Sequence, residues 1–188
     1  MRWLVLLLVL CSLPVGADER ISVCFNYGCR EQADVVFRDD QLRVLGILLG
    51  RALDAAQERE EIGAAIGRML GWAGDQTPIS ADRGGNIADG GVDGRMDCID
   101  HSTTTTRLLR LMEKMGWLRF HRVLEPAVRY RFLFFEHHSA LIEEIQPSTV
   151  QVTPADFVVD SWFFDNGHPA AVLPLDRWLA GESPDVSE

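Results

Sequence analysis

Residues 94–116 read GRMDCIDHSTTTTRLLRLMEKMG, and they divide the chain into two kinds of pattern. The stretch predicts a helix over 98–115, which Gly116 ends. The apolar side of this helix is formed by Leu108, Leu109, Leu111, Met112 and Met115. Before it, over 39–72, apolar residues recur at spacings of three and four, which predicts two consecutive helices. After it the residues are strand-forming, so we expect an α+β domain in which N-terminal helices pack on a small antiparallel sheet.

Shorter patterns predict strands and one long loop outside these helices. Aromatic and β-branched residues predict strands at 21–24, 117–124, 130–145 and 157–164, and a short last helix is expected at 174–179. Residues 74–95 are rich in Gly, Asp and Asn, which is typical of a long functional loop. The acidic residues of this loop lack the alternate spacing of a calcium-binding loop, so solvated turns are the favoured interpretation.

The N-terminus has the three-part layout of a secretory signal. A basic start precedes an apolar run of about eleven residues, and small residues ending in Ala17 follow it. Spanning a bilayer needs roughly 17–25 apolar residues. We therefore expect 1–17 to be a cleaved signal peptide and 18–188 to be a single domain, periplasmic or secreted, with no stable membrane insertion after cleavage.

The composition is acidic and restricts the partners. The chain has 18 basic against 28 acidic residues and a formal net charge of −10. Such a charge disfavours nucleic acid and anionic membrane surfaces as partners. The composition indicates nothing about the oligomeric state.

Removal of the signal leaves an odd number of cysteines. Cys24 and Cys29 flank a short turn, which favours a disulfide that stabilises the fold by only about 2 kcal/mol because its loop is small. Two free thiols or a metal site are the alternatives, although two cysteines without a nearby histidine make a poor zinc site. Cys98 then has no partner, and an unpaired thiol in an exported protein is a candidate nucleophile.

Histidine and carboxylate partners for Cys98 follow it in the chain. The predicted helix start lowers the pKa of the thiol, and the neighbouring Asp97 and Asp100 oppose that effect. His137 and His138 are adjacent in a predicted strand, so only one of them can face the Cys98 helix. The His137 face looks drier, which favours His137 as the base over His138. It carries Leu133, Phe135, Ser139 and Leu141.

Asp160 is the candidate for the third member of a triad. It lies in an apolar predicted strand, where a carboxylate must be paired or hydrogen-bonded. Pairing with an imidazole on the next strand would fix the tautomer of the ring. Asp165 is a rival, and a bond from Asp160 to backbone would be purely structural. A lone cysteine or histidine is usually inert packing, so the hypothesis depends on the order Cys, His, Asp along these elements.

On these residues the sequence resembles the transglutaminase-like cysteine superfamily, in particular the bacterial transglutaminase-like cysteine proteinases. The resemblance covers roughly 90–165 and is carried by 97–100 opening a helix, 137–141 on a strand and 158–160 on the next strand. It implies a papain-like core with Cys98 as nucleophile, His137 or His138 as base and Asp160 orienting that base, without metal or cofactor. Many relatives have an aromatic residue just after the nucleophile or two after the histidine, where this chain has Ile99 and Ser139 or Ala140.

The resemblance implies an enzyme that cleaves peptide or glutamine-type amides through a thioester. Hydrolysis is favoured over transfer to an amine, and a protein or peptide is the expected substrate. The backbone N–H of Cys98 and the loop 84–86 are candidate oxyanion donors. One alternative is a peptidoglycan peptidase, of the kind that opens a helix with Asp-Cys followed by Ser-Gly, whereas Ile99 and Asp100 stand here. The other is a non-catalytic binding module on a degenerate protease-like core.

Overall fold

The computed structural model describes residues 17–86, 88–131, 135–145 and 155–184. Apart from Ala17, the predicted signal peptide lies outside the described residues. The described chain contains four α-helices and one short 3₁₀ helix, η1. They are α1 (Asp39–Gly50), α2 (Ala55–Gly74), η1 (Pro78–Ala81), α3 (Cys98–Lys114) and α4 (Leu175–Leu179). The two consecutive helices, the helix that begins at Cys98 and the short last helix are therefore confirmed.

The strands form two antiparallel sheets, which confirms the α+β class. The first is a hairpin of β1 (Glu19–Phe25) and β2 (Glu31–Phe37). The second has the order β3-β5-β6-β7, and β4 also pairs with β5. Its strands are β3 (His121–Val123), β4 (Ala127–Arg131), β5 (Phe135–Glu144), β6 (Asp156–Asp160) and β7 (Ala171–Pro174).

Several predicted strand limits differ from the structure. The expected strand 130–145 is divided between β4 and β5, and residues 132–134 lie outside the described part. The expected strand 157–164 ends at Asp160, because the residues that follow turn back toward the 82–85 loop, where the Gly85 N–H donates to the Trp162 carbonyl. Strands β2 and β7 were not predicted, since neither has a clear alternating pattern.

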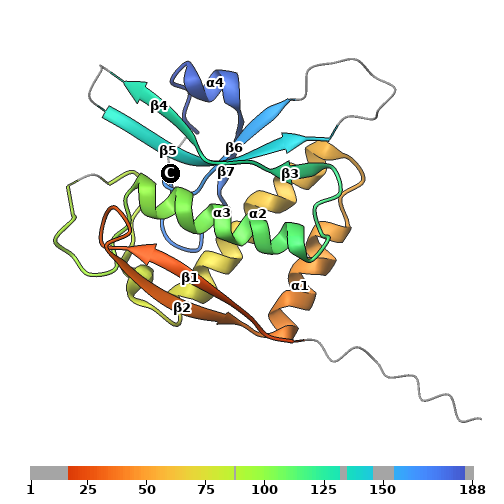
Figure 1. Cartoon of the computed structure of the whole chain (residues 1–188), viewed down its shortest axis with the longest axis horizontal. Helices are drawn as coiled ribbons and strands as arrows, with labels where there is room; N and C mark the ends of the chain where they lie inside the picture. The colour runs from red at the N-terminus through yellow and green to blue at the C-terminus, as the bar shows by residue number, and fades with distance from the viewer. Residues whose placement is uncertain (1–16, 87, 132–134, 146–154, 185–188) are drawn as a thin grey trace, which may run out of the picture.

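Helix α3 lies at the centre of the molecule, between the β1–β2 hairpin and the large sheet (Figure 1). Its buried side forms one core with α1, α2 and the near face of the sheet, where Ala140, Ile142 and Val159 lie. Helix α4 lies on the opposite side of the sheet (Figure 1). There Leu141, Val158 and Trp178 form a second, smaller cluster. The two faces of β5 therefore pack against different helices.

Local chemistry sets both ends of α3. The Asp97 side chain caps the first turn, where its Oδ1 accepts the N–H groups of Ile99 at 3.0 Å and Asp100 at 2.9 Å. Gly116, with φ of +71°, ends the helix as expected. Thr104 is fully buried although threonine is a poor helix former, and its hydroxyl accepts the Cys24 N–H at 2.9 Å. Burial and this bond to the hairpin hold that turn.

Candidate functional site

Cys98 is the first residue of α3, and its thiol lies at the edge of β5. Sγ is 3.9 Å from the Glu136 carbonyl oxygen, and the side chain is partly exposed. A backbone hydrogen bond from His138 also reaches the sulfur. Strand β6 pairs with β5 only from Ala140 onward, so the start of β5 has this edge uncovered by β6. The thiol thus contacts the strand backbone on both sides of His137.

His137 is paired with Asp160, as the sequence predicted. The His137 Nε2 lies 2.7 Å from Asp160 Oδ2, and Asp160 is only 1% exposed. The same carboxylate accepts the Trp178 indole N–H at 3.0 Å and the Trp162 backbone N–H at 3.2 Å. A carboxylate oxygen only accepts, so the bond to Asp160 uses the Nε2–H of His137 and does not involve Nδ1.

Aromatic rings surround His137 and hold its plane. The ring centroids of Trp162, Trp178 and Phe163 lie 4.9, 5.6 and 5.6 Å from that of His137. Trp162 and Phe163 follow β6 directly, and Trp178 comes from α4. These contacts and the bond to Asp160 restrict the orientation of the imidazole.

The reasoning that selected His137 from the faces of β5 is wrong in one respect. His137 lies on the face of Leu141 and Trp178, away from α3, whereas His138 lies on the face of Ala140, toward α3. The His138 Nε2 is 3.5 Å from a carboxylate oxygen of Glu136. The thiol lies at the edge of β5 rather than over either face of the strand. Whether a histidine faces α3 therefore does not decide which of His137 and His138 is the candidate base.

Cys98 and His137 are neighbours, but the described residues include no hydrogen bond between them. The thiol points to the Glu136 carbonyl, and the ring bonds to Asp160. Burial raises the pKa of Cys98, and the charges of Asp97 and Asp160 raise it further, against the backbone bond from His138. The expected lowering by the helix N-terminus is outweighed, so this arrangement favours the neutral thiol.

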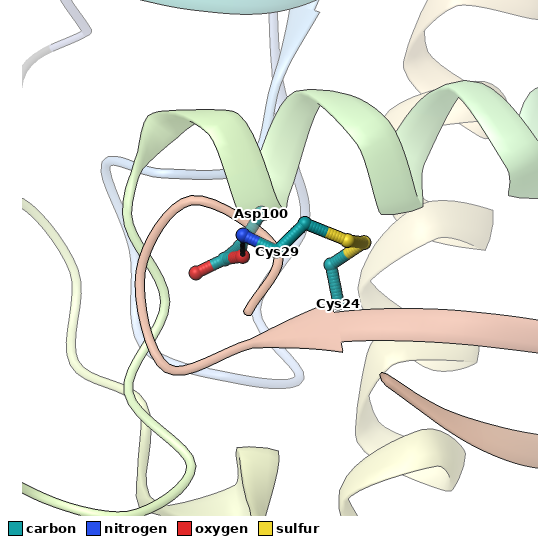
Figure 2. Close-up of side chains that lie close together, drawn as sticks. All are labelled: Cys24, Cys29 and Asp100. Carbon is teal, nitrogen blue, oxygen red and sulfur yellow. Dashed lines mark hydrogen bonds between the residues drawn. A yellow bond between two sulfur atoms is a disulfide. The ribbon is translucent and has the colours of Figure 1, made fainter. Parts of the chain in front are cut away.

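The predicted Cys24–Cys29 disulfide is present, and it closes a loop that docks on α3. The Cys29 backbone N–H donates to Asp100 at 2.6 Å (Figure 2). That of Tyr27 donates to Asp100 at 2.8 Å, and that of Gly28 donates to Asp97 at 2.9 Å. Residues 26–29 all have positive φ between 55° and 69°, so successive N–H groups point to one side. The loop thereby engages both carboxylates that flank Cys98.

Asp100 is buried in this contact, and its ionisation is perturbed. Burial raises the pKa of Asp100 to about 6, with a contribution from the charge of Asp97, against the backbone N–H donors that lower it. The ligand atoms of Asp100, Cys24 and Cys29 lie within 4.8 Å of one another. A disulfide offers no thiolate to a cation, so this cluster in its oxidised form does not have the donor chemistry of a metal site.

The rival carboxylate and the loop 84–86 have other roles in the described structure. Asp165 accepts the Gly84 N–H at 3.0 Å and an Arg83 N–H at 2.9 Å, and the Gly84 bond lowers its pKa. Gly84 packs so closely on the backbone of Phe163 and Phe164 that a side chain there would collide with it. The N–H of Gly85 is bonded to Trp162, so this loop buttresses the aromatic residues beside His137.

Sequence reasoning missed a second polar cluster next to the site. His101, on α3, bonds through Nε2 to Asp82 at 3.0 Å and through Nδ1 to Ser161 at 2.9 Å. The three side chains are 3%, 1% and 5% exposed. The sequence offered one signal for this cluster. His101 is one helical turn after the candidate Cys98, and Ser161 is the next residue after the candidate Asp160.

Comparison of the chain with family models, curated proteins and solved structures finds no significant match. The fold and site therefore define a class only: an α+β domain in which a partly exposed histidine, bonded to a buried aspartate, lies beside a partly exposed cysteine. No helix in the described residues is long and apolar enough to cross a membrane. The disulfide is compatible with the expected periplasmic or secreted location.

Proposed function

We propose that the protein is a thiol enzyme in which Cys98 is the nucleophile, His137 the base and Asp160 the residue that orients the base. One observation carries the proposal: the His137–Asp160 pair, at 2.7 Å, belongs to the strand segment whose backbone contacts the Cys98 thiol. The resemblance to transglutaminase-like cysteine proteinases, which implies the same three roles for these residues, is a second support for the proposal.

The proposed reaction cleaves a peptide or glutamine-type amide. The thiol proton passes to His137 Nδ1 as sulfur attacks the amide carbonyl, and the resulting imidazolium protonates the leaving amine. Water, activated by His137, then hydrolyses the thioester and releases the acid. The Cys98 backbone N–H, at the helix start, is the proposed donor to the oxyanion.

The raised pKa of Cys98 shapes this mechanism. A preformed thiolate–imidazolium pair would require a lowered thiol pKa. Here the neutral thiol is favoured at rest, so His137 must remove the proton as substrate binds and as water leaves the site. Asp160 raises the pKa of the thiol through its charge, and in the same position it stabilises the imidazolium that forms.

The same raised pKa favours one competing interpretation, a non-catalytic binding module. In that interpretation Cys98 packs inertly against β5, and the His–Asp pair is only structural. The peptidoglycan peptidase alternative has no such observation in its favour. Reactivity of Cys98 separates an enzyme from an inert module.

Acylation by p-nitrophenyl acetate tests the proposed nucleophile and base. The thiol sulfur would displace p-nitrophenolate and carry the acetyl group as a thioester, which intact mass and peptide mapping locate. We expect acetylation at Cys98 in the parent and in His138→Ala, none in Cys98→Ala, and a rate about 10²–10⁴ lower in His137→Ala. Equal rates in the parent and His137→Ala would contradict the assigned base, and the absence of any acylation in the folded parent would favour the binding module.

A further inference from the structure

A continuous buried hydrogen-bond network links the Asp82 loop, α3 and the end of β6, and the last two of these carry the proposed catalytic residues Cys98 and Asp160. Asp82 accepts the Met96 backbone N–H at 2.9 Å through one oxygen and the His101 Nε2–H at 3.0 Å through the other. The His101 Nδ1 lies 2.9 Å from the Ser161 hydroxyl oxygen. Thr105, which is fully buried, lies 2.9 Å from the same hydroxyl and completes its bonding.

The donors and acceptors in this network determine one another. A carboxylate only accepts, so His101 donates to Asp82 through its Nε2–H. In the neutral ring the Nδ1 lone pair accepts the Ser161 hydroxyl, and Thr105 donates to Ser161. Buried polar groups are costly when unpaired, so the network is satisfied only when the three segments keep one relative position.

Each end of the network is next to a residue of the proposed site. His101 is one helical turn after Cys98, and Met96 is two residues before it. Ser161 directly follows Asp160, at the end of β6. The backbone that carries the proposed nucleophile is thus connected to the backbone that carries the proposed orienting carboxylate. Among the described residues, the connecting side chains form no hydrogen bond with the thiol or with the His137 ring.

We propose that His101 is a positioning residue, which with Asp82 and Ser161 sets the distance between Cys98 and the His137–Asp160 pair. This inference rests on the proposed function. Reacting groups must be aligned closely, and a misplacement of about 1 Å can cost about 10²-fold in rate. His101 lies where a small shift of α3 against β6 would change that alignment.

The chain contains a matched control for this proposal. His121 and Glu58 form a second buried imidazole–carboxylate pair, with Nδ1 2.8 Å from Glu58 Oε2. Both side chains are 0% exposed. His121 pairs across the sheet with Glu144, at the end of β5 opposite to His137. Removing either imidazole takes one donor from a buried carboxylate that keeps its backbone N–H donors, and only His101 is connected to the proposed site.

The experiment compares His101→Gln with His121→Gln in the otherwise unchanged oxidised protein. The readouts are urea unfolding, the rate of Cys98 acetylation by p-nitrophenyl acetate and the pH profile of that rate. We expect both variants to lose stability, and only His101→Gln to lose acetylation rate, by at least about 10-fold, with a changed pH profile. Equal rates in the two variants, after correction for the folded fraction, would overturn the proposal.

Ser161→Ala and Ser161→Thr keep the test decisive if His101→Gln does not fold. The alanine removes only the hydroxyl, and the threonine retains it. We expect Ser161→Ala to slow acetylation and Ser161→Thr to restore the rate, while equal rates for both would overturn the proposal. If His137→Ala lowers the acetylation rate but no change at 101 or 161 alters it, only this inference fails. If His137→Ala also leaves the acetylation rate unchanged, the proposed function fails as well.

Discussion

Similar imidazole–carboxylate pairs lie at the two ends of β5, in different settings. At its start His137 bonds to Asp160 at 2.7 Å, and near its end His121 bonds to Glu58 at 2.8 Å. The His137 side chain is 13% exposed, and a partly exposed thiol lies beside it. The His121–Glu58 pair is completely sealed. The pair alone therefore does not define a site: solvent access and a neighbouring thiol distinguish one end from the other.

The sealed pair has the bonding of a structural clamp. Glu58, on α2, accepts the backbone N–H groups of Arg119 and Phe120 at 2.7 and 2.9 Å, in addition to His121. Arg59 lies 3.3 Å from the other ring nitrogen of His121. Burial alone would raise the pKa of Glu58, but the bonds from His121 and from the two backbone N–H groups outweigh it and lower that pKa. The clamp holds α2 to the sheet.

The largest expected effect comes from breaking the open pair without changing its shape. In Asp160→Asn the amide can present its N–H to His137 Nε2, which moves the ring proton to Nδ1 and removes the basic lone pair. We expect acetylation of Cys98 to slow by about 10⁴, as wrong tautomers do in serine proteases. Stopped-flow kinetics with p-nitrophenyl acetate measure the acetylation rate, and circular dichroism confirms that the variant is folded. A rate within a few-fold of the parent would show that Asp160 does not orient a base.

Breaking the sealed pair should have the opposite outcome. Glu58→Gln leaves buried donors without an anionic acceptor, so we expect a loss of about 3 kcal/mol in the free energy of unfolding. Urea unfolding followed by tryptophan fluorescence measures the loss. The acetylation rate of the folded fraction should equal that of the parent. A large loss of that rate would mean that the two ends of β5 are coupled, contrary to the comparison.

The disulfide loop provides a smaller effect at the open end. Reduction of Cys24–Cys29, or the double change Cys24→Ser and Cys29→Ser, should reduce stability by about 2 kcal/mol because the closed loop is short. Peptide mapping with iodoacetamide should label Cys98, and should label Cys24 and Cys29 only after reduction. Labelling of those two in the folded, untreated protein would show that the pair is not bonded in solution.

The smallest effect is a pair of pH dependences with opposite signs. The folded-state pKa of Asp100 is raised from 3.8 to about 6, so its contribution to stability is complete below pH 3.8 and is lost as pH rises toward 6. The folded-state pKa of Glu58 is lowered from 4.5, so its contribution is present above pH 4.5 and is lost as pH falls.

Urea midpoints between pH 3.5 and 7 measure both slopes. Asp100→Asn should remove the decline between pH 4 and 6, and Glu58→Gln should remove the loss on the acid side. An unchanged profile in Asp100→Asn would mean that the docked loop does not perturb this carboxyl.

The sequence alone determined the helices and indicated the residues of the candidate site. Apolar spacing over 39–72 and after Cys98 predicts helices correctly, because an amphipathic helix needs only its own residues to show which side is buried. Short stretches of sequence are also enough to recognise the odd cysteine, the short turn between Cys24 and Cys29, and an aspartate amid apolar residues. The pairing of His137 with Asp160 follows from adjacent strands.

Only the tertiary structure decided which groups act on one another across the fold. Strand alternation indicates that His137 and His138 are on opposite faces, but not that the thiol would lie at the strand edge between them. The bonds of Asp97 and Asp100 to the disulfide loop join segments about seventy residues apart. The Asp82–His101–Ser161 network is equally non-local. A raised thiol pKa is a sum over such neighbours and over burial, and burial is a property of the packed chain rather than of any stretch of its sequence.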